Sequence, residues 1–274
     1  MPLILTRENA LDSKRSYASG LLTAWGVSVI LIGLLSACAG TKERGPMSSR
    51  EKARTLVEVA NGALSEGDPT GALTALVSAE ALDDSLPELY HSRALAFIAK
   101  KNTQAALENA QKAVTIFPNY SDACTTLGKL LLDQGRFSEA ETYLKRAATD
   151  SLYRDAYRAQ TSLGILYYRQ SKWTLAQKEL DSAIDSEPEQ SCVAFYYRGH
   201  LRMKDSNMAS AIRDYSRATQ RLCGGFGDAH YALGVALAKN RQYSEARKKF
   251  IEIRDRYPDS ALATQAMEGL KYLP

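Results

Sequence analysis

The sequence predicts an all-α protein built from six successive helical hairpins and a C-terminal capping helix. From Ser121 to Thr149 the apolar residues recur at spacings of three and four, as on two amphipathic helices interrupted around Gly135. A hairpin of this size cannot bury its own apolar faces, so a stable fold requires neighbours of the same kind. Matching hairpins do recur along the chain, and their period supports the same fold class.

The recurrence consists of three series of mostly small residues. The first series marks the middle of each first helix, at steps of 34, 34, 36, 35 and 35 residues: Ala60, Ala94, Gly128, Gly164, Gly199 and Gly234. Twelve residues after each of these comes an alanine: Ala72, Ala106, Ala140, Ala176, Ala211 and Ala246. The third series lies near the end of each second helix: Ala79, Ala113, Ala147, Ala183, Ala218 and Ile253. Small residues at these positions allow neighbouring helices to approach closely.

Three series in step at this period resemble the tetratricopeptide repeat. Two further marks of that family are present, an aromatic residue at the turn and a closing proline: Phe137, Trp173, Tyr243, and Pro118, Pro188, Pro258. The resemblance covers residues 53–260 and implies a right-handed superhelical solenoid of six tetratricopeptide-type helical hairpins. Residues 261–274 carry apolar side chains at helical spacing and are expected to form the capping helix of the last hairpin.

The amino terminus predicts a lipoprotein signal peptide over residues 1–37. Its apolar run, Leu21 to Leu35, has fifteen residues, which is short for a membrane span of about twenty and typical of a signal-peptide core. The run leads into Leu35-Ser36-Ala37-Cys38, which resembles the bacterial lipobox. The resemblance implies cleavage before Cys38, a diacylglyceryl group on its thiol, and acylation of the new amino terminus by a fatty acid such as palmitate. An uncleaved anchor helix is the alternative.

The residues after the lipobox predict the location of the protein. Position 39 is alanine, and no aspartate stands there to retain a lipoprotein in the inner membrane. For a Gram-negative source, the resemblance to sorted lipoproteins implies a lipid anchor in the outer membrane, with the protein facing the periplasm. Residues 38–52 are rich in glycine, serine and charge without an apolar period, so they are expected to form a lipidated flexible tether.

Three cysteines remain beyond Cys38. We expect Cys192 to open the first helix of the fifth repeat and Cys223 to end the second, which places both at the same end of an antiparallel pair. Packed helices lie about 8–10 Å apart, close enough for a disulfide between inward-facing cysteines, and the periplasm favours oxidation. We therefore predict a Cys192–Cys223 bond. Cys124 is expected to be a buried apolar residue.

Composition and motifs argue against several classes of function. The formal net charge is +4 with both signs interspersed, which gives no electrostatic footprint for nucleic acid. His91, His200 and His230 fall in different repeats, and the chain has no phosphate-binding glycine loop, no nucleophile elbow and no HExxH motif. We expect no enzyme activity, no metal site and no cofactor.

The expected function is therefore protein binding. In the tetratricopeptide-repeat family, a concave groove is lined by first-helix residues at fixed distances from the small residue. The resemblance places these residues in the groove: Leu64, Leu95, Ile98, Lys129, Leu132, Thr161, Ile165, Tyr168, Tyr196, His200, Met203, Tyr231 and Val235. Many of these residues are apolar, and Lys129, Arg169, Lys204 and Lys239 are expected at the rim. Such a groove suits a peptide with hydrophobic anchors and some acidic side chains.

A lipobox, a polar tether, six repeats and a cysteine pair in the fifth repeat together resemble the pilotin lipoproteins of type IV pilus biogenesis. This resemblance implies an outer-membrane protein that binds subunits of the pilus secretin and promotes their localisation and assembly into a ring. Two alternatives within the binding class remain open: an adaptor lipoprotein that docks envelope proteases or cell-wall hydrolases, and a component of outer-membrane protein assembly.

Overall fold

The computed structural model describes residues 46–274, so the predicted signal peptide and Cys38 lie outside the described residues. Apart from one short 3-10 helix, all regular structure in this range is α-helical. Six antiparallel hairpins succeed one another: α2 (Ser49–Ser65) with α3 (Pro69–Leu82), α4 (Pro87–Ala99) with α5 (Thr103–Ile116), α6 (Ser121–Asp133) with α7 (Phe137–Ala148), α8 (Ala156–Arg169) with α9 (Trp173–Ser186), α10 (Cys192–Lys204) with α11 (Met208–Arg217), and α12 (Gly227–Lys239) with α13 (Tyr243–Arg256). Helix α14 (Ala261–Lys271) follows them.

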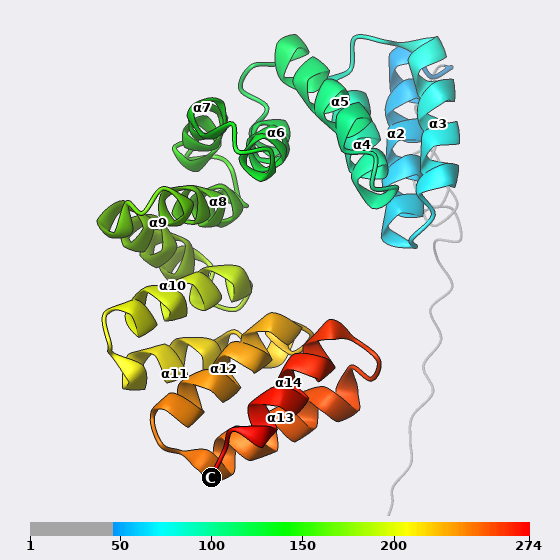
Figure 1. Ribbon diagram of the computed structural model, residues 1–274. Coiled ribbons are helices and arrows are strands. Elements are labelled where there is room, and N and C mark those ends of the chain that lie inside the picture. The colour runs from blue at the N-terminus through cyan, green and yellow to red at the C-terminus, as the bar shows by residue number, and fades with distance from the viewer. Residues whose placement is uncertain (1–45) are drawn as a thin grey trace, which may run out of the picture. The chain divides into compact units, whose positions relative to one another are not determined.

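The hairpins stack in chain order within the compact unit Ser48–Pro274 (Figure 1). Each second helix packs against its own first helix and against the first helix of the next hairpin. The first helices of the first five hairpins also contact their neighbours, as α6 does with α8 and α8 with α10, so the first helices form the inner row of the array. Helix α14 covers α13 and also contacts α12. This arrangement confirms the predicted right-handed superhelical solenoid of six hairpins with a capping helix.

The small residues that define the repeat lie at the helix contacts. The alanines of the second series, from Ala72 to Ala246, are all fully buried, as are Ala60 and Ala94 of the first. Each of the four glycines of the first series faces the residue sixteen positions later on its partner helix: at Gly128, an added Cβ would lie 2.6 Å from Leu144 Cγ. The close approach of the two helices therefore depends on the missing side chain.

The turn inside each hairpin uses one residue with left-handed backbone. These residues recur in register with the repeat: Gly67, Lys101, Gly135, Ser171, Ser206 and Arg241, with φ between 57° and 81°. The backbone amide of the next residue donates a hydrogen bond to a carbonyl in the last turn of the first helix, as the Asn207 amide does to the Arg202 carbonyl at 2.8 Å. This is the Schellman pattern of helix termination, in which the left-handed position favours glycine. Only two of the six turns have glycine there, so the sequence shows this feature only in part.

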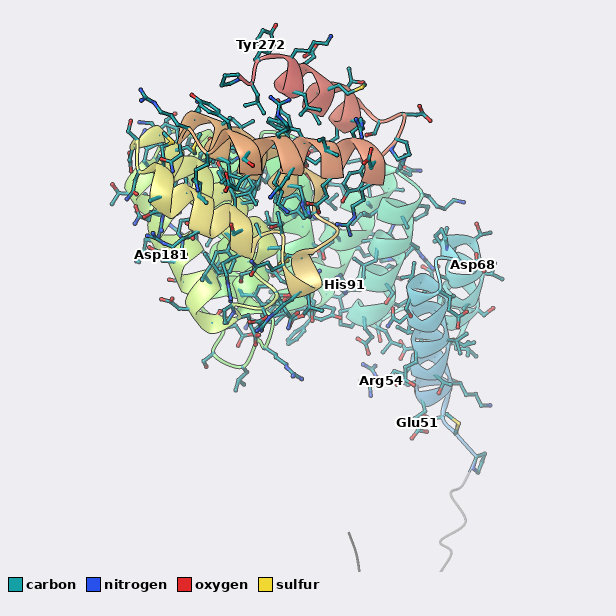
Figure 2. The ribbon with its side chains drawn as sticks, turned by 90° about the horizontal axis from the view of Figure 1, so that it is seen from below. Glu51, Arg54, Asp68, His91, Asp181 and Tyr272 are labelled. Atoms are coloured by element: carbon teal, nitrogen blue, oxygen red, sulfur yellow. A yellow bond between two sulfur atoms is a disulfide. The ribbon has the colours of Figure 1, made fainter. Side chains whose placement is uncertain are left out.

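The first helix begins earlier than predicted. We expected the flexible tether to run to residue 52, but α2 begins at Ser49. The Ser48 hydroxyl accepts a hydrogen bond from the Glu51 amide at 3.2 Å, and the Glu51 carboxylate accepts one from the Ser48 amide at 2.8 Å. This capping box satisfies two free amides and fixes the helix start. Figure 2 shows Glu51 and Arg54 at this end of α2, with Asp68 at the start of α3 beyond its other end.

The structure contains the Cys192–Cys223 disulfide, with Cα atoms 5.4 Å apart. Cys192 is the first residue of α10, as expected. Cys223 does not end a second helix as we expected, because α11 stops at Arg217 and Cys223 lies in the short 3-10 helix Arg221–Cys223. After α11 the chain turns back toward the start of α10, where Cys223 meets Cys192. Cys124 is a buried free thiol.

No helix within residues 46–274 has the length and apolar character needed to span a bilayer.

Two glycine-to-alanine substitutions should have opposite effects on stability. At Gly199 an added Cβ would lie 2.6 Å from Cε1 of the Tyr215 ring, which is 1% exposed. We expect Gly199→Ala to lower the free energy of unfolding, because overpacking costs about 1–3 kcal/mol and outweighs the roughly 1 kcal/mol gained from alanine in a helix. Urea denaturation followed by circular dichroism measures the change.

Gly62→Ala is the matched control. Gly62 also lies inside a first helix, but no atom is within 4 Å of the added Cβ. This substitution should raise the free energy of unfolding by about 0.5–1 kcal/mol through helix propensity alone. Equal effects of the two substitutions would contradict the proposed role of the small residues.

Candidate peptide-binding groove

The inner row of helices contains two hollows. The first has a volume of about 560 Å³ and lies among α4, α6, α8 and the start of α10. Five of the predicted groove residues line it: Leu95, Ile98, Lys129, Thr161 and Ile165. Leu130 and Val193 add apolar surface, whereas Asp122, Asp133 and Arg158 add charges of both signs. The first hollow therefore offers an apolar floor with a mixed polar rim.

Two tyrosines of the first hollow come from a place that the repeat pattern did not predict. Tyr153 lies in the turn between α7 and α8, and Tyr157 lies in the first turn of α8. The Tyr153 hydroxyl donates to Asp122 Oδ1 at 3.1 Å, and the Tyr157 hydroxyl donates to Gln190 Oε1 at 3.0 Å. The step of 36 residues between Gly128 and Gly164, against 34 or 35 elsewhere, was the available signal. The longer turn brings Tyr153 into the groove.

His91 also lines the first hollow and is held by two neighbours. Its Nε2 lies 3.0 Å from Thr126 Oγ1, and its Nδ1 lies 3.3 Å from the Tyr120 hydroxyl. Burial lowers the pKa of His91 to about 4, and the carboxylate of Asp122 opposes this shift only in part. His91 is therefore neutral at neutral pH and acts as a hydrogen-bonding wall residue.

The second hollow lies among α10, α12 and α14 and also has a volume of about 560 Å³. Five more of the predicted groove residues line this second hollow: Tyr196, His200, Met203, Tyr231 and Val235. The structure adds residues that the prediction did not include in the groove: Lys204, Tyr215, Asp228, Ala232, Lys239 and Gln265. Of these, Lys204 and Lys239 were expected at the rim, whereas Gln265 comes from the capping helix.

Aromatic side chains hold the wall of the second hollow. The Tyr196 and His200 rings meet edge to face with centroids 4.4 Å apart, and the Tyr215 hydroxyl lies 3.1 Å from His200 Nδ1. Burial lowers the pKa of His200, so the neutral ring is favoured. Tyr168, a predicted groove residue, lines neither hollow and packs instead against Trp173, Tyr197 and His200. These contacts make a rigid aromatic wall.

Two other predicted groove residues do not reach a hollow. Leu132 is only 2% exposed and belongs to the hydrophobic core, so its prediction as a groove residue is wrong. Arg169 of α8 covers this end of α6, since its Nη1 donates to the Leu132 carbonyl at 3.0 Å. Leu64 is partly buried against the core and lines neither hollow.

A buried ion network connects α9, α10 and α11, and it was not predicted from the sequence. Asp214 of α11, whose side chain is 4% exposed, accepts hydrogen bonds from Arg198 at 2.8 and 3.0 Å. Arg202 Nε lies 3.0 Å from the same carboxylate, and Arg198 also reaches Asp181 of α9 at 2.6 Å. Arg198 lies on α10, between α9 and α11, and its two ion pairs therefore connect the second helix of the fourth hairpin with that of the fifth.

Neither hollow carries an arrangement typical of catalysis. Within the described range, no three His, Cys, Asp or Glu side chains come together as a metal site. His230 lies away from both hollows, with its Nε2 3.0 Å from the Gly224 carbonyl. The hollows present apolar, aromatic and charged side chains on helices, which is the chemistry of a polypeptide-binding surface.

Comparison with known proteins identifies the repeats. One family model, described as tetratricopeptide repeat, matches residues 97–151, and a second model with the same description matches residues 125–191 and 196–261. Together these matches cover more than half of the chain. One chain in the crystal structure of the APC/C hetero-tetramer Cut9–Hcn1 superimposes with a TM-score of 0.72 at 17% identity, over 81% of this chain and 43% of that chain.

Two similar proteins align with this chain over nearly their own whole length. The type IV pilus assembly protein PilF of Pseudomonas aeruginosa is 23% identical over 239 residues, which are 85% of this chain and 93% of PilF. A solved structure of Pseudomonas aeruginosa PilF has a TM-score of 0.68 at 18% identity, over 80% of this chain and 98% of that one. The type IV pilus biogenesis factor PilW has a TM-score of 0.69 at 18% identity, over 78% and 98%.

Proposed function

Because the chain belongs to the tetratricopeptide-repeat proteins, we propose that it is a non-catalytic scaffold that binds another polypeptide in its inner groove. We propose more specifically that it acts in type IV pilus biogenesis as a pilotin. In this role it binds subunits of the pilus secretin, escorts them to the outer membrane and promotes their assembly into a ring.

One observation carries the proposal: the similarity to the pilus assembly protein PilF extends over 85% of this chain and 93% of PilF. A likeness limited to one or two repeats would support the fold alone, because such repeats occur in proteins of many functions. Here the match extends over 239 residues, which is far longer than one or two repeats. The two hollows add a surface on which a secretin segment can lie.

The proposed location rests on the amino terminus. Cys38 follows the apolar run and the small residues Ser36 and Ala37, as a lipidated cysteine does after a signal peptide. Several acyl chains give near-permanent membrane anchoring, since each buried CH₂ contributes about 0.8 kcal/mol. The Cys192–Cys223 bond suits an oxidising compartment such as the periplasm. We therefore place the protein on the periplasmic face of the outer membrane.

The proposed mechanism combines the anchor with the groove. The lipid fixes the protein at the outer membrane, and the groove holds a segment of the secretin subunit. Tethering raises the effective concentration of subunits at the place where the ring forms, so a modest affinity is sufficient. No bond is made or broken in this scheme.

Gene deletion with complementation tests this function. Loss of the gene should abolish SDS-resistant secretin multimers in the outer membrane and surface pili, and the wild-type gene should restore both. Cys38→Ser should prevent incorporation of labelled palmitate and leave secretin multimers out of the outer membrane, whereas Cys124→Ser should keep the label. Normal multimers and pili in the deletion strain would refute the pilotin role.

A further inference from the structure

The ends of three successive first helices carry a row of cations. Arg169, Lys204 and Lys239 are the last residues of α8, α10 and α12, and each lies five positions after the small residue of its helix. All three side chains are exposed. Because equivalent positions of stacked repeats line up along the array, these cations lie along one edge of the groove.

The three cations differ in their partners. Arg169 Nη1 donates to the Leu132 carbonyl at 3.0 Å, and its Nη2 lies 3.7 Å from Asp133. Lys204 and Lys239 both line the second hollow, and neither takes part in an ion pair with a carboxylate among residues 46–274. The one acid that lines this hollow, Asp228, lies near the opposite end of α12 from Lys239. The edge with the two lysines therefore has unmatched positive charge.

Lys204 is also held in place. Its Nζ lies 4.9 Å from the centroid of the Trp173 ring, at the amino end of α9. A cation over an aromatic face is attracted by the ring quadrupole, and it keeps its N–H donors for other groups. Between the two lysines and Asp228, the hollow presents an apolar surface that includes Tyr196, Met203, Tyr231 and Val235.

We propose that the second hollow is the acid-recognition site of the groove. Its ligand is a polypeptide segment with two carboxylates, which pair with Lys204 and Lys239, and a large apolar side chain, which enters the hollow beside Met203 and Tyr231. This inference rests on the proposed binding function and names the chemistry of the partner. A segment in the polyproline II conformation has three residues per turn and rises about 3.1 Å per residue, so acids three residues apart lie on one side of it, roughly 9 Å apart, and can both face the edge with the two lysines.

Two synthetic peptides test the site with the full-length protein. One twelve-residue peptide carries two glutamates three residues apart with a phenylalanine between them, and its counterpart has glutamine in place of both glutamates. We expect fluorescence anisotropy to give at least tenfold tighter binding of the glutamate peptide at about 50 mM salt. The difference should shrink as salt is added, since partly exposed charges are screened.

Charge reversal ties the peptide preference to the two lysines. Lys204→Glu with Lys239→Glu should weaken binding of the glutamate peptide at least tenfold. The control, Lys178→Glu with Lys248→Glu, makes the same charge change on exposed lysines of the second helices α9 and α13 and should leave binding unchanged. If the two lysines only stabilised the carboxyl ends of their own helices, charge reversal would change the binding of the glutamate and glutamine peptides equally.

Four results would overturn the assignment: equal binding of the two peptides, no binding of either, equal effects of the two double variants, or an oligothymidylate that binds as tightly as the glutamate peptide and responds to the same reversal.

Cell experiments separate this inference from the proposed function. If the reversed variant supports piliation and the deletion does not, the acid site is wrong and the pilotin role stands. If the deletion strain is normally piliated, the pilotin role is wrong while the peptide result stands by itself.

Discussion

Replacing Asp214 with alanine is expected to lower the free energy of unfolding by about 3–5 kcal/mol, the usual cost of removing one partner of a buried ion pair. The Asp214 side chain is 4% exposed and satisfies both Arg198 and Arg202. Without it, Arg198, whose side chain is 13% exposed, keeps only the partly exposed Asp181 as a partner. Urea denaturation measures the loss, and hydrogen exchange should locate it in α10 and α11.

Asp181→Ala is the control for this prediction. Asp181 contacts the same arginine at 2.6 Å, but its side chain is 37% exposed, and Figure 2 shows it on α9. Exposed ion pairs contribute about 0.2–1 kcal/mol, so this substitution should have a small effect. If Asp214→Ala were as mild as Asp181→Ala, the buried carboxylate of Asp214 would not be what stabilises the packing of α10 against α11.

Removal of the disulfide is the second large effect. A double variant with Cys192→Ser and Cys223→Ser should lose about 3–4 kcal/mol of unfolding free energy, because the bond closes a loop with a sequence separation of 31 residues in the unfolded chain. The bond holds the short 3-10 helix Arg221–Cys223 to the start of α10. Its loss should therefore loosen the junction between the fifth and sixth hairpins first.

Reductant provides the control for the disulfide. Dithiothreitol should lower the urea midpoint of the wild-type protein toward that of the double variant and should not change the midpoint of the double variant. Cys124 remains in both proteins, so an effect of reductant on that thiol would appear in both. An unchanged wild-type midpoint under reducing conditions would contradict the prediction.

The repeat itself could be predicted from the sequence because it depends on residue size at fixed spacing. Positions such as Ala140 and Ala211 are fully buried, and no larger side chain fits where two helices touch. The capping helix followed from the apolar residues after the last hairpin. Ten of the thirteen predicted groove residues line one of the two hollows, since the register relative to the small residue decides which way a first-helix side chain points.

The ion network and the burial of Leu132 could not be predicted, because they depend on contacts in the folded array that the repeat pattern does not show. Arg198 occupies the register of Leu127 and Leu163, so it lies where other repeats have core leucines, and only the fold shows that Asp214 and Asp181 meet it. A charged residue at a core position of a repeat was the signal for a buried ion pair. Leu132 was misplaced because its side chain packs into the hydrophobic core, which the spacing from Gly128 does not show.

Recognition of a secretin subunit by the inner face of the array can be tested directly. A photo-crosslinking amino acid at Ile98, in the first hollow and 42% exposed, tests it in cells against the same group at Val77, 64% exposed on α3 and part of neither hollow. We expect a crosslinked band that contains the secretin from position 98 and none from position 77. Crosslinks to the secretin from position 77 alone, or to the secretin from neither position, would contradict it.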